Sequence, residues 1–152
     1  MATIQRNPAI TPEALNARNA DYLPGLVGLR IVDVGDGVIS GELPLRKALL
    51  APNGYLHAAS VVALADSLCG LGCVAHLPQG ATGFTTIELK TNFLGSALDG
   101  QIDSRATLEH GGRTTQVWDA AVTHRQTGKT IALFRCTQMV LWPKADAGQV
   151  SS

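Results

Sequence analysis

The stretch from Ala58 to Leu77 is apolar almost all round, and no other feature constrains the fold as strongly. A helix that lacks a polar face is buried on most of its sides. Its most apolar part, residues 61–75, is shorter than the roughly 20 residues that span a bilayer, and Asp66 within it would be costly against lipid. We therefore expect a core helix ended by the turn at residues 78–80, and no membrane partner.

Most of the remaining chain consists of short β-forming runs separated by Gly- and Asp-containing turns. Strands are expected over residues 27–34, 38–45, 84–94, 101–109, 114–124 and 130–142. Within 84–94, Ile87, Leu89 and Phe93 alternate with polar residues, which predicts a half-buried strand. Strands joined by short turns indicate an antiparallel sheet, and a lone apolar helix needs a sheet to cover it, so the fold class is α+β.

The two ends of the chain are predicted to lie outside this single domain, which spans residues 25–142. In the N-terminal segment, residues 1–24, Thr11-Pro12-Glu13 is typical of a helix start, and this short helix should end before Pro24-Gly25. Residues 143–152 are small and polar, and we expect a disordered tail.

Charge and cysteine content exclude several classes of partner. Lys+Arg and Asp+Glu number 12 each, so the basic surplus of a nucleic-acid-binding protein is missing and no nucleic-acid partner is expected. Three cysteines, an odd number, suggest reduced thiols and a cytoplasmic protein. No Cys or His spacing completes a metal site, so we predict no metal.

The segment from Asn53 to Asp66 resembles the signature of the phenylacetate-degradation and 4-hydroxybenzoyl-CoA group of hotdog thioesterases. That signature is roughly G-x-x-H-G-G, followed by a buried helix with Asp or Glu nine residues after the His, and Gly54, His57 and Asp66 match it. Residues 87–94 resemble the family's central strand, and residues 112–119 resemble its CoA-contacting turn and strand. The resemblance implies a hotdog fold, in which a curved antiparallel sheet wraps around one long buried helix.

The resemblance also implies an acyl-CoA thioesterase that needs no cofactor, since CoA is part of the substrate. Asp66 would attack the thioester carbonyl or draw a proton from the attacking water. The backbone N–H of Ala58, at the start of the helix, would hold the developing oxyanion. Because about 12 Å of helix rise separates Ala58 from Asp66, one chain cannot supply both groups. The family solves this with a homodimer, alone or as a dimer of dimers.

The other candidate residues near this site each have a functional and a structural interpretation. His57 orients the loop or the substrate, or it only caps the helix. Asn53 positions water or the carbonyl, although it lies two residues later than the family's Asn. Thr86 supplies a hydroxyl near Asp66, or it is an ordinary strand threonine.

The turn formed by Gly112, Arg113 and Thr114 is the candidate CoA-binding element. Glycine-flanked turns expose N–H groups and arginine binds phosphate well, but a solvated hairpin arginine has the same sequence. Two departures from the family stand out: its His-Gly-Gly is His57-Ala58-Ala59 here, and Gly95-Ser96 replaces the frequent Arg-Pro.

Two other functions fit the same resemblance. A hotdog hydratase or dehydratase pairs a His with a carboxylate in one site, whereas His57 here belongs to the helix-start motif. A non-catalytic acyl-CoA binding module would bind CoA without turnover, and the Ala58-Ala59 change keeps this alternative open. The acyl group stays open between aryl and medium-chain.

Overall fold

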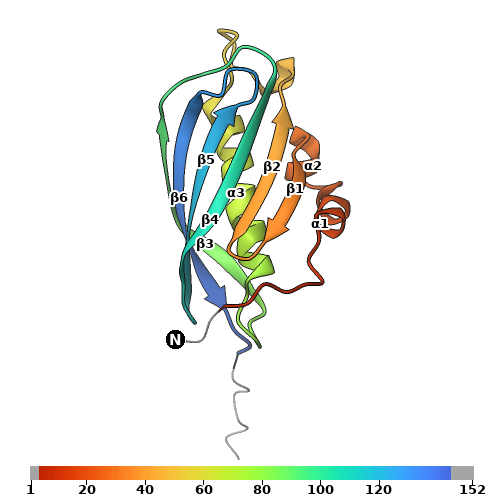
Figure 1. The fold of residues 1–152 in the computed structure, drawn as a ribbon, viewed down its shortest axis with the longest axis vertical. Helices are drawn as coiled ribbons and strands as arrows, with labels where there is room; N and C mark the ends of the chain where they lie inside the picture. Colours follow the sequence, from red (N-terminus) through yellow and green to blue (C-terminus); the bar gives the residue numbers. More distant parts are fainter. Residues whose placement is uncertain (1–3, 145–152) are drawn as a thin grey trace, which may run out of the picture.

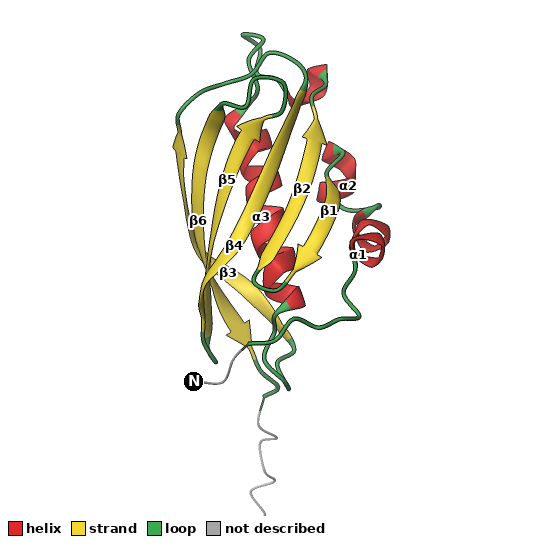
Figure 2. Ribbon diagram, viewed as in Figure 1, coloured by secondary structure: helices red, strands yellow, loops and turns green. Residues whose placement is uncertain are grey.

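The computed structural model describes residues 4–144, and within them a six-stranded antiparallel sheet curves around one long helix (Figures 1 and 2). The strands are β1 (Arg30–Gly35), β2 (Val38–Pro44), β3 (Gly83–Phe93), β4 (Gln101–Gly111), β5 (Thr115–His124) and β6 (Thr130–Leu141). The helices are α1 (Pro12–Asn19), α2 (Leu23–Val27) and α3 (Ala58–Ala75), with a 3-10 turn at Lys47–Leu49. The spatial order β1-β2-β4-β5-β6-β3 leaves β1 and β3 at the edges. The predicted α+β hotdog fold is confirmed.

The helix α3 is the centre of the core, as predicted. It contacts all six strands, and 10 of its 18 residues are buried. Its length and hydropathy alone would also suit a membrane span, but its burial against the sheet is that of a core helix. The helix ends at Ala75, two residues earlier than expected, because the ring of His76 turns back to bind the Gly72 carbonyl and to accept the Gly37 N–H.

The N-terminal segment contains two helices where the sequence predicted one. The hydroxyl of Thr11 caps α1 by accepting the Ala14 N–H at 3.2 Å, as expected. The helix that follows Thr11 ends at Asn19, before Pro24-Gly25 as predicted, but a second helix, α2, spans Leu23–Val27, so the strand predicted from residue 27 is wrong at its start. Proline is tolerated in the first turn of a helix, where its missing N–H has no partner to lose. The domain boundary after residue 24 therefore falls inside α2, and β1 begins only at Arg30.

The strand β3 differs most from its prediction. Ile87, Leu89 and Phe93, expected to be the buried face, are 56%, 45% and 49% exposed. Two causes are visible: β3 is an edge strand that pairs only with β6, and an irregularity between Thr86 and Glu88 interrupts the alternation. The apolar side of β3 is therefore open in the single chain.

At the remaining boundaries the differences are small. The strand β4 continues to Gly111, past its predicted end at Glu109, so that the following turn is shorter than expected. Residues 145–152 of the predicted tail lie outside the described residues.

Candidate active site

Asp66 lies on the less buried side of α3, next to the edge strand β3 of the sheet. It lines a pocket of about 250 Å³ together with residues of α2, α3 and β3, and these are Pro24, Ser67, Gly70, Leu71, Phe84 and Thr86. The pocket is thus built where the N-terminal helices and the edge strand β3 approach the exposed side of the core helix. The structure brings two predicted site residues, Asp66 and Thr86, to one place.

The carboxylate of Asp66 has no compensating donor. Its Oδ1 atom is buried and accepts no hydrogen bond from any described residue. Burial raises the pKa of Asp66 above its ordinary value of 3.8, because the charged form loses hydration. The structural interpretation of such a residue, a carboxylate bonded to the neighbouring strand, would require a partner that the described residues do not supply. An unpaired carboxylate in a pocket can act as a base or a nucleophile.

Thr86 faces the same pocket, but its hydroxyl proton points elsewhere. The hydroxyl donates to Oε1 of Gln138 at 2.7 Å, and Gln138 is a fully buried residue of β6. The oxygen of Thr86 is consequently available to accept a hydrogen from a group in the pocket. Sequence reasoning missed Gln138, although a polar residue at an inward position of β6, between Cys136 and Val140, was a signal for it.

The predicted helix-start residues do not reach the Asp66 pocket of their own chain. His57 caps α3, since its Nδ1 accepts the Ala59 N–H at 2.9 Å. Ala58 is exposed, and its N–H meets no acceptor among residues 4–144. The side chain of Asn53 accepts the Tyr55 N–H at 3.2 Å and so closes a local turn. A free donor and a free carboxylate therefore lie at separate places on α3, about 12 Å apart along its axis.

The predicted CoA-contacting turn borders a separate and larger cavity of about 700 Å³. Gly112 and Arg113 line it with Trp142, which follows β6, and with Pro78 and Gln79, which follow α3. The Arg113 guanidinium lies 4.7 Å from the centre of the Trp142 ring, and the indole N–H donates to the Arg113 carbonyl. Thr114 does not line the cavity.

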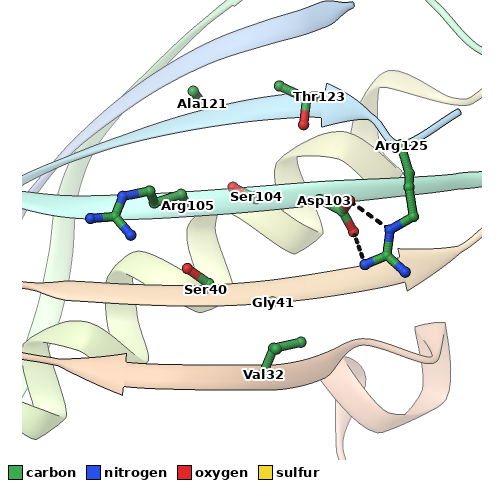
Figure 3. A pocket seen from close by; sticks show the side chains of 9 residues that line it. All are labelled: Val32, Ser40, Gly41, Asp103, Ser104, Arg105, Ala121, Thr123 and Arg125. Atoms are coloured by element: carbon green, nitrogen blue, oxygen red, sulfur yellow. Dashed lines mark hydrogen bonds and ion pairs between the residues drawn. The ribbon is translucent and has the colours of Figure 1, made fainter. Parts of the chain in front are cut away.

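A third hollow, of about 370 Å³, lies on the outer face of the sheet (Figure 3). Figure 3 shows Asp103 and Arg125 bonded to each other at one end of it, and both contacts measure 2.8 Å. Arg125 also donates a hydrogen bond to Glu42. Burial raises the pKa of Glu42, but the hydrogen bonds from Arg30, Arg125 and Gln101 lower this pKa by more. The pKa of Glu42 therefore lies below its ordinary value. Both carboxylates are thus paired with arginines, and among the described residues this hollow offers no unpaired carboxylate.

The cysteines offer no alternative nucleophile. Cys69, Cys73 and Cys136 are buried free thiols. Burial raises the pKa of Cys73 to about 12, and a hydrogen bond with Cys136 together with burial raises the pKa of Cys69. The thiols of Cys69 and Cys73 therefore stay protonated, and a thiol is a far weaker nucleophile than a thiolate. Cys136 is buried in the core and lines none of the three hollows described above. Within residues 4–144, no three His, Cys, Asp or Glu side chains cluster closely enough to hold a metal ion.

Comparison with known proteins identifies relatives over nearly the whole chain. Residues 53–131, which include every predicted site residue, match the Thioesterase superfamily. The chain is 31% identical over 111 residues to the 1,4-dihydroxy-2-naphthoyl-CoA hydrolase of Listeria monocytogenes, which covers 73% of this chain and 89% of that protein. Identity to the Escherichia coli protein of the same name is 28%, covering 87% of this chain and 96% of the relative.

Solved structures share the fold. A mutant thioesterase from Pseudomonas aeruginosa superposes with a TM-score of 0.85 at 28% identity, covering 91% of this chain and 98% of that one. The PaaI protein of the E. coli phenylacetic acid degradation operon has a TM-score of 0.75 at 21% identity, with 84% and 90% of the two chains covered. At that identity the second likeness supports the fold alone.

Proposed function

Because this chain belongs to the Thioesterase superfamily and is a thioester hydrolase, we propose that it cleaves an aryl- or medium-chain acyl-CoA to the free acid and CoA. The observation that carries the proposal is the buried Oδ1 of Asp66, which has no hydrogen-bond partner among residues 4–144 and lies in a residue that lines a pocket. The relatives named as hydrolases of an aryl-CoA favour an aryl acyl group.

In the proposed reaction, the carboxylate of Asp66 attacks the thioester carbonyl or takes a proton from a water that attacks it. The carbon–sulfur bond breaks, and the sulfur leaves as the CoA thiolate, which takes up a proton that comes from the water. If the carboxylate is the nucleophile, the acyl group is first held as a mixed anhydride with Asp66, and water then hydrolyses this anhydride to the free acid and restores the carboxylate. If water is the nucleophile, the oxygen of Thr86 can accept its second hydrogen, because the proton of Thr86 is committed to Gln138. Both routes need an ionised Asp66.

The developing oxyanion needs a donor, and the free N–H of Ala58 is suited to that role. Its distance from Asp66 in the same chain requires that a second chain supply it. The unpaired edge of β3 supports such a homodimer, since exposed Leu89 and Phe93 lie on a strand that still has backbone groups to pair. Two such dimers could associate further.

We propose that the nucleotide part of CoA binds at the cavity beside Gly112 and Arg113. The guanidinium would contact phosphate oxygens, and the exposed Thr114 hydroxyl lies next to it in the chain. In this proposal the protein works in the cytoplasm without a further cofactor, because the reaction consumes only acyl-CoA and water.

A thiol-release assay tests the proposal, with benzoyl-CoA, hexanoyl-CoA and decanoyl-CoA as substrates. Asp66→Asn should lower kcat by about 10²-fold or more, since it removes the only proposed base or nucleophile. Asp36→Asn is the matched control, because Asp36 is a solvent-exposed turn residue. This control should leave kcat unchanged.

The alternatives give different results. A hydratase or dehydratase would alter the acyl 2,3-bond without releasing thiol, and no His side chain lines the Asp66 pocket among the described residues to favour it. A binding module would bind CoA without turnover. Full activity in Asp66→Asn would refute the role of the carboxylate.

A further inference from the structure

Of the residues that the structure describes, Phe84 is the one aromatic residue that lines the Asp66 pocket. We propose that this ring, seated on Gly70, determines acyl-group specificity and favours a compact, flat acyl group over a long chain. The inference rests on the proposed function, because it concerns the same pocket.

The contact between the ring and the helix depends on Gly70. A methyl group added at Gly70 would lie 2.9 Å from Cζ and 3.4 Å from Cε2 of Phe84, closer than packed atoms approach. Phe84 pairs with the buried Val140 in the β3–β6 ladder, so its side chain points toward α3. The edge of the ring thus rests on the helix backbone, which only glycine leaves accessible.

The position of Gly70 places the ring beside the reactive carboxylate. Residues four apart lie on the same face of a helix, so Gly70 follows Asp66 by one turn on the pocket side of α3. The ring of Phe84 therefore borders the pocket on the side of the C-terminal half of the helix. An acyl chain bound beside Asp66 would meet the ring before it could extend along α3.

The rest of the pocket divides into a polar and an apolar part. Asp66 and Thr86 supply the polar groups, whereas Pro24 and Leu71 add apolar surface to that of Phe84. A flat apolar group such as a benzoyl ring fills a small space of this kind and packs against an aromatic side chain in an offset or edge-to-face arrangement. A flexible acyl chain of ten carbons is too long for this pocket and cannot stack on the ring of Phe84.

The test is the ratio of kcat/KM for decanoyl-CoA to kcat/KM for benzoyl-CoA. In Phe84→Ala the ratio should rise by roughly ten-fold or more, because space opens beyond Gly70 and the aromatic contact is lost. Gly70→Ala should push the ring into the pocket and lower kcat/KM for both substrates, with acetyl-CoA affected least. Leu133→Ala, which shortens an exposed side chain on the outer face of β6, should leave the ratio unchanged.

Each possible outcome supports or overturns the inference. Phe84→Leu is the second variant if Phe84→Ala does not fold, and it should move the ratio in the same direction. An unchanged ratio in a folded variant overturns the inference. This includes the case in which kcat/KM changes by the same factor for all acyl groups, because the ring would then contact the CoA part of the substrate and not the acyl group. A wild-type protein that releases CoA from no acyl-CoA refutes the proposed function itself, and the inference with it.

Discussion

Asp66 is an ionisable group that the fold keeps in apolar surroundings at a cost in stability. Burial raises its pKa in the folded chain, so its ionised form is destabilising relative to the unfolded chain, where the value is near 3.8. This cost grows as the pH rises above 3.8 and is fully present above the raised pKa. Catalytic groups are often destabilising in this way.

We therefore expect Asp66→Asn to be more stable than the wild type at pH 7, by about 1 kcal/mol, because a neutral amide replaces an unpaired carboxylate. This electrostatic cost should vanish at pH values well below 3.8, where the wild-type carboxyl is protonated in both states. Urea unfolding of the two proteins at both pH values measures it. A wild type that is the more stable protein at pH 7 would mean that a partner group compensates Asp66.

The hydrogen bond from Thr86 to Gln138 leads to a second prediction at the same scale. Thr86→Val removes the proposed acceptor for the attacking water while keeping the shape of the side chain. It should lower kcat about ten-fold and leave KM unchanged, since one hydrogen bond to a reacting group is lost. Thr86→Ser, which keeps the hydroxyl, should retain kcat. If Thr86 merely anchors Gln138, Thr86→Val will reduce the unfolding free energy and not kcat.

The sequence revealed Asp66 more readily than its neighbours in the pocket. A charge within an apolar helix stands out, and His57 at a fixed spacing adds a motif. Phe84 and Pro24 belong to ordinary local patterns, and only the fold brings them to the same face of α3. Gly70 was a weak signal, because a glycine inside a helix usually has a packing reason that sequence cannot specify.

Among the elements, α3 and the sheet approach each other closely at Gly72. A methyl group there would lie 2.8 Å from two ring atoms of Trp118 and 3.1 Å from Ile39, both of which are fully buried. Gly72→Ala should therefore destabilise the fold by about 1–2 kcal/mol, although alanine is the better helix former. Gly83→Ala, whose added methyl meets no atom within 4 Å, should change stability by less than about 0.5 kcal/mol. Urea unfolding compares the two, and equal stabilities would contradict the close packing.

Element types were predictable wherever a local rule was sufficient. Hydroxyl capping at Thr11 and the turn at Gly37, where φ is 65°, follow from residue chemistry alone. The alternation in β3 predicted a buried face, but alternation does not say which surface covers that face. In the single chain, no element covers Leu89 and Phe93 completely. The predicted burial of this face of β3 was wrong because β3 is an edge strand whose apolar side chains are uncovered in the single chain. The same uncovered edge supports the proposed association of two chains.

On the scale of the whole molecule, the free donor and the free carboxylate lie on one rigid helix and cannot meet within a chain. The proposed homodimer would therefore have to bring Ala58 of one chain toward Asp66 of the other. Ala58 is the first residue of α3, and His57 before it is extended, with φ −68° and ψ 136°. Proline is well tolerated at the first position of a helix and after an extended residue. Ala58→Pro should therefore remove the backbone N–H and preserve the helix.

Mixing two inactive variants tests whether the active site is shared between chains. Ala58→Pro and Asp66→Ala should each form inactive homodimers, because each lacks one group at both sites. In a mixed dimer, the intact Asp66 of one chain would face the intact Ala58 of the other, so that half of the sites recover thiol release. Unfolding and refolding the two variants together forms such dimers, and refolding each alone is the control. If both groups instead acted within one chain, every site of the mixed dimer would lack either its donor or its carboxylate, and the mixture would be as inactive as its components.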